Sequence, residues 1–200
     1  MSSNSKVAKK QRKKGVSSWE IIGGVVIIVL AIWGVYSFTQ PSQPTQTTTA
    51  SVQTTTGSGA QDFTLPIVGP NGLTGQMASL SSFRGKVVLL EFMEPWCPHC
   101  QNMAPVLDTL YQQYGPQNVV FLSVSGPWNG ATASDAAGFI RNYHSGWTYV
   151  YDSSGTTFDA FGVTATPTFF IIGKDGTVAA TYPGEVPAST IAADLTRLNT

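Results

Sequence analysis

Apolar residues in the second half of the chain alternate between short continuous runs and runs with helical spacing. Val87 to Met93 is apolar except for Glu91, which predicts a central strand covered on both faces. Met103 to Tyr114 has apolar side chains three and four residues apart, which predicts a helix, and Pro105 predicts a kink in it. Further strands are expected at 119–124, 148–151, 168–172 and 177–182, helices at 134–143 and 190–198, and a leading hairpin within 62–80. This order of strands and helices predicts an α/β domain.

The most apolar stretch of the chain lies near its N-terminus, from Ile21 to Phe38, and carries no charge. It is long enough to cross a hydrocarbon core of about 30 Å at a rise of 1.5 Å per residue. Six Lys and Arg residues precede it, and the next basic residue is Arg84. The asymmetry predicts a single-pass anchor at 19–38 in the plasma membrane, a basic cytoplasmic tail at 1–18 and an extracytoplasmic remainder. A cleaved signal peptide shares the basic flank, but its apolar region would be shorter and would end in a small-residue cleavage site.

Residues 39–61 form a stretch rich in Thr, Pro and Gln with almost nothing apolar to bury. Such a composition cannot offset the entropy lost on ordering, so we expect a disordered linker that tethers the domain at 62–200. The chain carries 11 basic and 11 acidic residues, but five basic residues face ten acidic ones from Thr39 onward. An acidic domain argues against a nucleic-acid partner, which would require a basic face.

Both cysteines of the chain lie in one C-x-x-C, the segment Trp96-Cys97-Pro98-His99-Cys100. A structural disulfide closing so short a loop would restrict the unfolded chain little. A closed zinc site needs four ligands, and only His99 and His144 remain, so we expect neither a metal nor another cofactor.

Redox chemistry fits this pair better, because Cys97 follows a strand and begins a helix. Helix N-termini present free N–H groups and a positive dipole end, which favour the nucleophilic thiolate. Cys100, one turn further, is within reach to resolve a mixed disulfide on Cys97. Pro98 suits a first-turn position that needs no N–H, and His99 can add a positive charge or a donor near the sulfur.

Three segments resemble the thioredoxin-fold proteins, in particular the TlpA/ResA-like membrane-tethered members of the redoxin branch. They are the strand and active-site segment 87–100, the opening segments 62–65 and 80–86, and the segment 161–168 that resembles the loop carrying a cis-proline. The resemblance covers nearly all of residues 62–200. It implies a thioredoxin-like three-layer α/β/α sandwich with a mixed central sheet.

The resemblance also implies a role for each motif residue. Cys97 is expected to be the nucleophile and Cys100 the resolving thiol. Pro167 is expected to be the cis-proline that faces them, and Thr166 to offer backbone groups to an extended substrate strand. Without the resemblance, Pro167 would be taken for an ordinary turn proline, since cis bonds are only about 5–6% of X–Pro bonds.

Three residues near the motif, and Trp147 further along the chain, have expected roles of their own. Glu91 stands where thioredoxins carry a buried Asp, and burial should make it a proton acceptor for Cys100; the alternative is a carboxylate partly open to water. Glu94 is expected to be a solvated loop acid. Trp96 is expected to pack beside the disulfide and offer an apolar surface to substrates, while Trp147 is expected to pack in the core.

These features together predict an extracytoplasmic thiol–disulfide oxidoreductase whose partners are thiols and disulfides of exported proteins and a membrane redox partner. Peroxidases of the redoxin branch carry Thr or Ser three residues before the reactive Cys, where this chain has Glu94. The Pro-His dipeptide is that of the oxidising enzyme DsbA, which favours an oxidase or isomerase. The alternatives are a membrane-tethered reductant, as in cytochrome c maturation, and a redox-inert binding module or metal chaperone.

Overall fold

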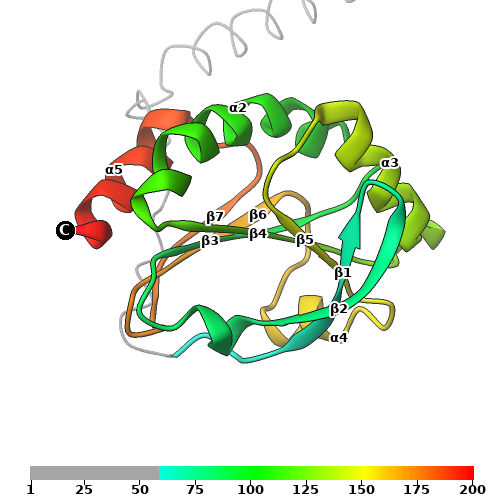
Figure 1. Cartoon of the computed structure of the whole chain (residues 1–200), viewed down its shortest axis with the longest axis horizontal. Coiled ribbons are helices and arrows are strands. Elements are labelled where there is room, and N and C mark those ends of the chain that lie inside the picture. The colour runs from blue at the N-terminus through cyan, green and yellow to red at the C-terminus, as the bar shows by residue number, and fades with distance from the viewer. Residues whose placement is uncertain (1–58) are drawn as a thin grey trace, which may run out of the picture. The chain divides into compact units, whose positions relative to one another are not determined.

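The computed structural model describes residues 59–200, which form one α/β domain (Figure 1). Its centre is a seven-stranded sheet in the order β2-β1-β5-β4-β3-β6-β7. The pairs β3–β4 and β4–β5 are parallel, and the remaining pairs are antiparallel, so the sheet is mixed as expected. The strands are β1 (Thr64–Gly69), β2 (Gly72–Ser79), β3 (Val88–Met93), β4 (Val120–Ser125), β5 (Thr148–Tyr151), β6 (Thr168–Ile172) and β7 (Val178–Pro183).

The two faces of the sheet are covered unequally. Three helices lie on one face and the short α4 lies on the other, as Figure 1 shows. The helices are α2 (Pro98–Tyr114), α3 (Ala133–Tyr143), α4 (Thr156–Ala160) and α5 (Ala188–Asn199), with 3-10 turns at Leu80–Phe83, Gly115–Gln117 and Trp128–Gly130. The three-layer sandwich is therefore present, but its second layer is thin and is completed by the turn Leu80–Phe83 and by aromatic side chains.

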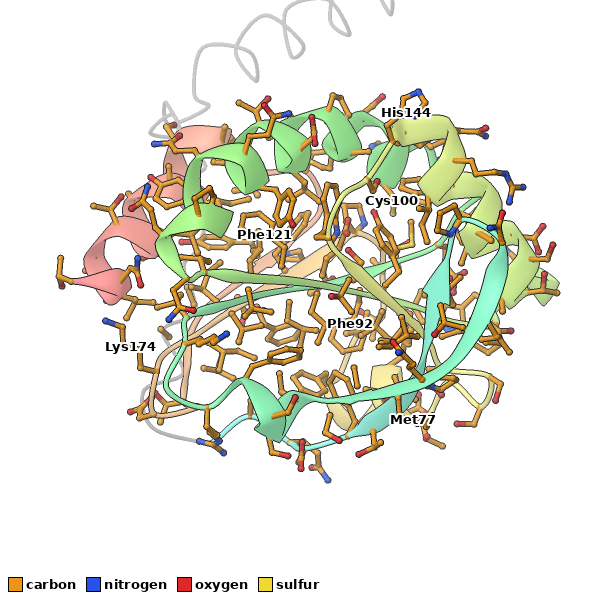
Figure 2. All side chains as sticks on the ribbon, in the orientation of Figure 1. Met77, Phe92, Cys100, Phe121, His144 and Lys174 are labelled. Carbon is orange, nitrogen blue, oxygen red and sulfur yellow. The ribbon has the colours of Figure 1, made fainter. Side chains whose placement is uncertain are left out.

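Side chains of each strand alternate between two hydrophobic clusters, one on each face of the sheet. Phe121 belongs to the cluster under α2, α3 and α5, and Phe92 to the cluster on the side of α4 (Figure 2). Phe92 packs against Phe158 and Phe170 with ring centroids 5.0 and 5.7 Å apart. In β3 this alternation directs Leu89 and Met93 toward the helices. Glu91 lies between them at the same spacing of two residues, so its side chain is on the same face.

Most predicted elements are confirmed, including the leading hairpin β1–β2 and the strands β5 and β6 at their expected bounds. Helix α2 begins at Pro98, directly after Cys97 as expected and five residues before Met103, and it includes Pro105. Helix α4 was not predicted. Residues 59–61 were assigned to the linker, but Gly59 pairs with Thr177 and the Ala60 amide donates to the Gly176 carbonyl. The domain therefore begins before the predicted boundary at residue 62.

The predicted tail, anchor and most of the linker lie outside the described residues. Within residues 59–200, no helix is both long enough and apolar enough to cross a bilayer.

Candidate active site

The two cysteines lie where the loop after β3 enters α2. The Cys97 amide donates to the Glu94 carbonyl at 3.1 Å, which closes the loop, and Cys97 is the N-cap of the helix. Its sulfur accepts the Cys100 N–H at 3.4 Å, and Pro98 occupies the first turn, where no N–H is required. Both side chains are buried, Cys97 with 4% and Cys100 with 0% of its surface exposed, and both are free thiols. Cys97 is the more accessible sulfur and is the one held by the helix N-terminus.

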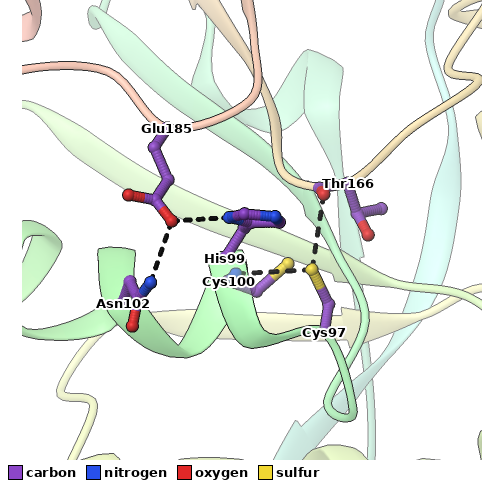
Figure 3. A network of polar contacts seen from close by, with 6 residues as sticks. All are labelled: Cys97, His99, Cys100, Asn102, Thr166 and Glu185. Carbon is purple, nitrogen blue, oxygen red and sulfur yellow. Dashed lines mark hydrogen bonds and ion pairs between the residues drawn. The ribbon is translucent and has the colours of Figure 1, made fainter.

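The loop before β6 approaches Cys97 from the other side, as expected. The Thr166–Pro167 peptide bond is cis. The Cys97 thiol donates to the Thr166 carbonyl at 3.3 Å (Figure 3). Cys97 therefore lies between the N-terminus of α2 and a backbone carbonyl that could otherwise accept a bond from a substrate strand.

The side chain of His99 contacts Glu185, a residue for which the sequence predicted no role. Its Nδ1 lies 2.7 Å from Oε1 of Glu185, in the loop between β7 and α5, and the Asn102 amide donates to the same oxygen at 2.9 Å (Figure 3). These two bonds hold the pKa of Glu185 below its ordinary value. All three side chains are exposed. The carboxylate therefore balances any positive charge that His99 carries.

The surroundings of Cys100 disfavour a thiolate, in contrast to those of Cys97 at the N-terminus of α2. Burial raises the pKa of the Cys100 thiol well above its ordinary value, and the nearby Glu91 and the bonded Cys97 sulfur raise it further. Cys100 thus needs a group that accepts its proton before it can attack.

Glu91 is a candidate for that group, and the expectation of a buried carboxyl is confirmed. It is 3% exposed on β3, opposite Ser123 of β4. The Ser123 hydroxyl donates to Glu91 Oε2 at 2.5 Å and accepts the indole N–H of Trp147 at 2.8 Å. Burial raises the pKa of Glu91 to about 7, although the bond from Ser123 lowers it. A carboxyl with this pKa can both accept and return a proton at neutral pH.

The expectation that Glu94 is a solvated loop acid is wrong. Its side chain is fully buried, and Oε1 accepts the Trp128 N–H at 3.2 Å, while Oε2 has no hydrogen-bond partner among the described residues. Burial raises the pKa of Glu94 to about 8, opposed by backbone bonds from Trp128 and Gly126. The sequence suggested solvent because the residue lies in a loop, but the turn 126–130 covers it.

Trp96 is 45% exposed beside the two cysteines, and its indole N–H donates to the Trp128 carbonyl at 3.0 Å. It forms one side of an open groove of about 610 Å³. The groove is lined by Trp96 and Gln101, by Asn129 and Ala131, and by α3 residues that include Phe139 and Tyr143. The groove combines aromatic side chains with polar ones such as Asp135 and Arg141, and the expectation that Trp96 presents an apolar surface to substrates stays a prediction. Trp147, by contrast, is buried in the core as predicted and stacks on Tyr149.

The predicted site residues thus gather at one end of the sheet, on the β3–α2 segment and the β6 loop. Four contributors were missed. Ser123 is a lone hydroxyl in an apolar strand, and the expected core packing of Trp147 gave no sign of the bond that its indole N–H donates to Ser123. Glu185 and Asn102 carry no motif; they meet His99 only because the β7–α5 loop folds over the start of α2.

A helix-borne C-x-x-C facing a cis-proline on a mixed α/β sheet defines this chain as a thioredoxin-fold protein with a dithiol site. A profile of the AhpC/TSA family matches residues 56–181. The chain belongs to the AhpC/TSA family.

Relatives within the family are named for redox chemistry. The chain is 31% identical over 115 residues to the thiol-disulfide oxidoreductase ResA of Bacillus thuringiensis subsp. konkukian, covering 56% of this chain and 64% of that protein. It is 33% identical over 122 residues to ResA of Geobacillus thermodenitrificans, covering 61% and 66%. The chain thus matches a little under two thirds of the length of these relatives.

A solved structure agrees with the fold. The exposed lipoprotein thioredoxin Etrx1 of Streptococcus pneumoniae superposes with a TM-score of 0.59 at 28% identity, covering 69% of this chain and 100% of that one.

Proposed function

We propose that this chain is an extracytoplasmic thiol–disulfide oxidoreductase that exchanges disulfides with exported proteins through Cys97 and Cys100. The observation that carries the proposal is the placement of the two sulfurs. Cys97 lies at the N-terminus of α2, bonded by the Cys100 N–H, and Cys100 lies one turn deeper. The ResA relatives bear the name of the same activity.

The chemistry requires two exchange steps. In the reducing direction, the Cys97 thiolate attacks one sulfur of a substrate disulfide and releases the other as a thiolate. Cys100 then loses its proton to Glu91 and attacks the Cys97 sulfur, which breaks the mixed disulfide and leaves the Cys97–Cys100 disulfide. In the oxidising direction the same steps run backwards, and a membrane redox partner removes the two electrons from the dithiol.

A simple assay tests the activity. The chain should catalyse reduction of insulin disulfides by dithiothreitol and reactivation of scrambled ribonuclease, and Cys97→Ser should reduce both rates to the uncatalysed level, because no attacking sulfur remains. Equal rates for the Cys97→Ser variant and the unaltered chain would instead favour a redox-inert binding module.

The direction we propose is that of an oxidase or isomerase. The Pro98-His99 dipeptide supports it, since a donor or positive charge beside Cys97 favours the thiolate and hence the reduced form of the enzyme. Equilibration with glutathione buffers measures the potential. We expect a value above about −200 mV, toward the about −120 mV of DsbA; a value close to the about −270 mV of thioredoxin would contradict the oxidase.

The second candidate is a membrane-tethered reductant, and the His99–Glu185 pair favours it. The Glu185 carboxylate lies 2.7 Å from the imidazole and offsets its charge, which weakens the contribution of His99 to thiolate stability. The same titration distinguishes the two directions.

The location is also a proposal and rests on the basic tail followed by the apolar run at 19–38. In intact cells, a membrane-impermeant maleimide should label Cys97 of the full chain after mild reduction, and Cys97→Ser should remove the label. Labelling only after the cells are permeabilised would place the domain inside.

A further inference from the structure

Glu94 is a buried acid that the exchange steps do not use. Its side chain is fully buried, although it lies only three residues before Cys97. The two ion pairs of the described residues, His99–Glu185 and Arg197–Asp194, do not include it. Burying a carboxylate without a nearby cation lowers the stability of the fold unless the group is protonated. A buried acid so close to the nucleophile therefore suggests a function for its side chain.

The contacts of Glu94 connect two loops. Oε1 accepts the Trp128 N–H at 3.2 Å, and the backbone of Gly126 also contacts the carboxyl, so Glu94 meets both ends of the first half of the turn 126–130. The second oxygen, Oε2, is buried and has no hydrogen-bond partner among the described residues. A second bond joins the same two loops, because the indole N–H of Trp96 donates to the Trp128 carbonyl.

The turn is fitted closely around the carboxyl. A Cβ placed on Gly126 would lie 2.9 Å from Glu94 Oε1 and 2.7 Å from the Phe158 ring. The backbone can therefore come this close to Glu94 only because residue 126 has no side chain. Trp128 packs on Phe158 with ring centroids 5.0 Å apart, and Asn129 adopts a left-handed conformation with φ 52°. Asn129 and Gly130 line the same groove as Trp96.

We propose that Glu94 is a positioning residue for protein substrates: its buried side chain holds the turn 126–130 against Trp96 and so fixes the groove that binds the polypeptide flanking a substrate's cysteine. This inference rests on the proposed exchange activity and names the class of substrate. A small disulfide, which reaches only the sulfur, does not use the groove.

The electrostatic surroundings keep this side chain neutral. Burial raises the pKa of Glu94 to about 8. The titratable group that faces it is Tyr151 of β5, whose own pKa is raised by burial and by Glu94, Asp135 and Asp152. All these neighbours are acidic or neutral, so ionisation would leave a buried carboxylate without compensation and would loosen the turn.

Kinetics of the full chain with two substrates test the proposal. For insulin, Glu94→Ala should raise KM about tenfold, the ratio expected from losing one buried hydrogen-bonded contact, with kcat within about twofold. For glutathione disulfide, the loss in rate should be much smaller. Glu94→Gln keeps an acceptor at Oε1 and stays neutral, so it should retain the insulin KM. Asp159→Asn, which removes an exposed acid from α4, is the matched control.

Three results would overturn the inference. An unchanged insulin KM in Glu94→Ala would show that the side chain positions nothing. An equal loss with insulin and glutathione disulfide would assign the effect to the sulfurs or to folding. A defect in Glu94→Gln as large as in Glu94→Ala would show that the neutral acceptor is not what matters.

A second measurement applies if Glu94→Ala fails to fold or if insulin is not reduced at all. The Trp96–Trp128 contact should make tryptophan emission change with a midpoint near pH 8 in the unaltered chain, and Glu94→Gln should remove this transition. Persistence of the transition in Glu94→Gln would overturn the inference. Loss of insulin reduction with the transition still present would contradict only the exchange activity.

Discussion

Glu91 and Cys100 lie on facing elements, β3 and α2, and the acid raises the pKa of the thiol. Because burial places the pKa of Glu91 at about 7, its carboxylate becomes available to accept the Cys100 proton as the pH rises through 7. The rate of resolution of a mixed disulfide on Cys97 should therefore increase through this range. Glu91→Gln should lower that rate by about 100-fold or more at pH 8 and remove the inflection. Stopped-flow tryptophan fluorescence of the pre-formed mixed disulfide measures it, and an unchanged profile would exclude Glu91 as the acceptor.

Ser123 should set the position of that inflection. Its hydroxyl donates to Glu91 Oε2 and lowers the pKa of the carboxyl, and its own orientation is fixed by the indole N–H of Trp147. Ser123→Ala removes the donor, so the inflection should move to a pH above 7. Ser125→Ala is the matched control on the same strand, because the Ser125 hydroxyl has no hydrogen-bond partner within residues 59–200. A shift toward acid pH in Ser123→Ala would contradict the assigned bond.

At the scale of elements, two glycines have opposite expected responses to alanine. Gly126 lies in the turn over Glu94, where a Cβ would meet the Phe158 ring at 2.7 Å, so Gly126→Ala should destabilise the fold by about 1–3 kcal/mol. Gly138 lies inside α3, where a Cβ would meet only Arg141 at an ordinary 3.6 Å. Gly138→Ala should therefore stabilise the fold by about 0.5–1 kcal/mol through helix propensity. Urea denaturation compares the two variants, and equal effects would show that the turn yields to the added methyl group.

How much of each element could be predicted depends on where its stabilising contacts come from. The strands β5 and β6 each begin with Thr and continue with aromatic and β-branched residues, so composition alone predicts their bounds. Helix α4 has only five residues and begins after Gly155 in a left-handed conformation. It is held by the Asp152 carboxylate, which accepts the amides of Gly155 and Thr157 at 3.0 and 2.7 Å. That Asp-capped turn has no hydrophobic period, so the pattern of apolar residues could not reveal it.

The same reasoning explains the candidate site. Cys97 and Cys100 are found from their spacing in one C-x-x-C, whereas the role of Pro167 was expected only from the resemblance to thioredoxin-fold proteins. The burial of Glu94 and the meeting of His99 with Glu185 depend on loops that come from distant parts of the chain. Neither could be predicted from neighbours in sequence, and the error over Glu94 followed from treating a loop position as solvent.

For the whole molecule, the two buried acids predict how stability depends on pH. The folded state binds protons on Glu91 and Glu94 up to pKa values of about 7 and 8, whereas their ordinary value is 4.5. Their stabilising protonation is complete below about pH 4.5 and is lost as the pH rises through 7 and 8. The free energy of unfolding should fall between pH 5 and 8.5, by about 3 kcal/mol for Glu91 alone. Urea denaturation across this range measures the fall, and the Glu91→Gln, Glu94→Gln double variant should flatten it. A stability that rises over this range would contradict both burial assignments.

The bond from the Cys97 thiol to the Thr166 carbonyl has a consequence for the timing of substrate binding. A thiol can occupy that carbonyl, but a thiolate has no hydrogen to give it. When Cys97 loses its proton, the carbonyl is freed at the same moment for the N–H of an incoming peptide. If a substrate strand pairs with Thr166, as the resemblance to thioredoxin-fold proteins leads us to expect, loss of the Cys97 proton both charges the sulfur and frees the carbonyl, and the peptide would meet a sulfur that is already charged.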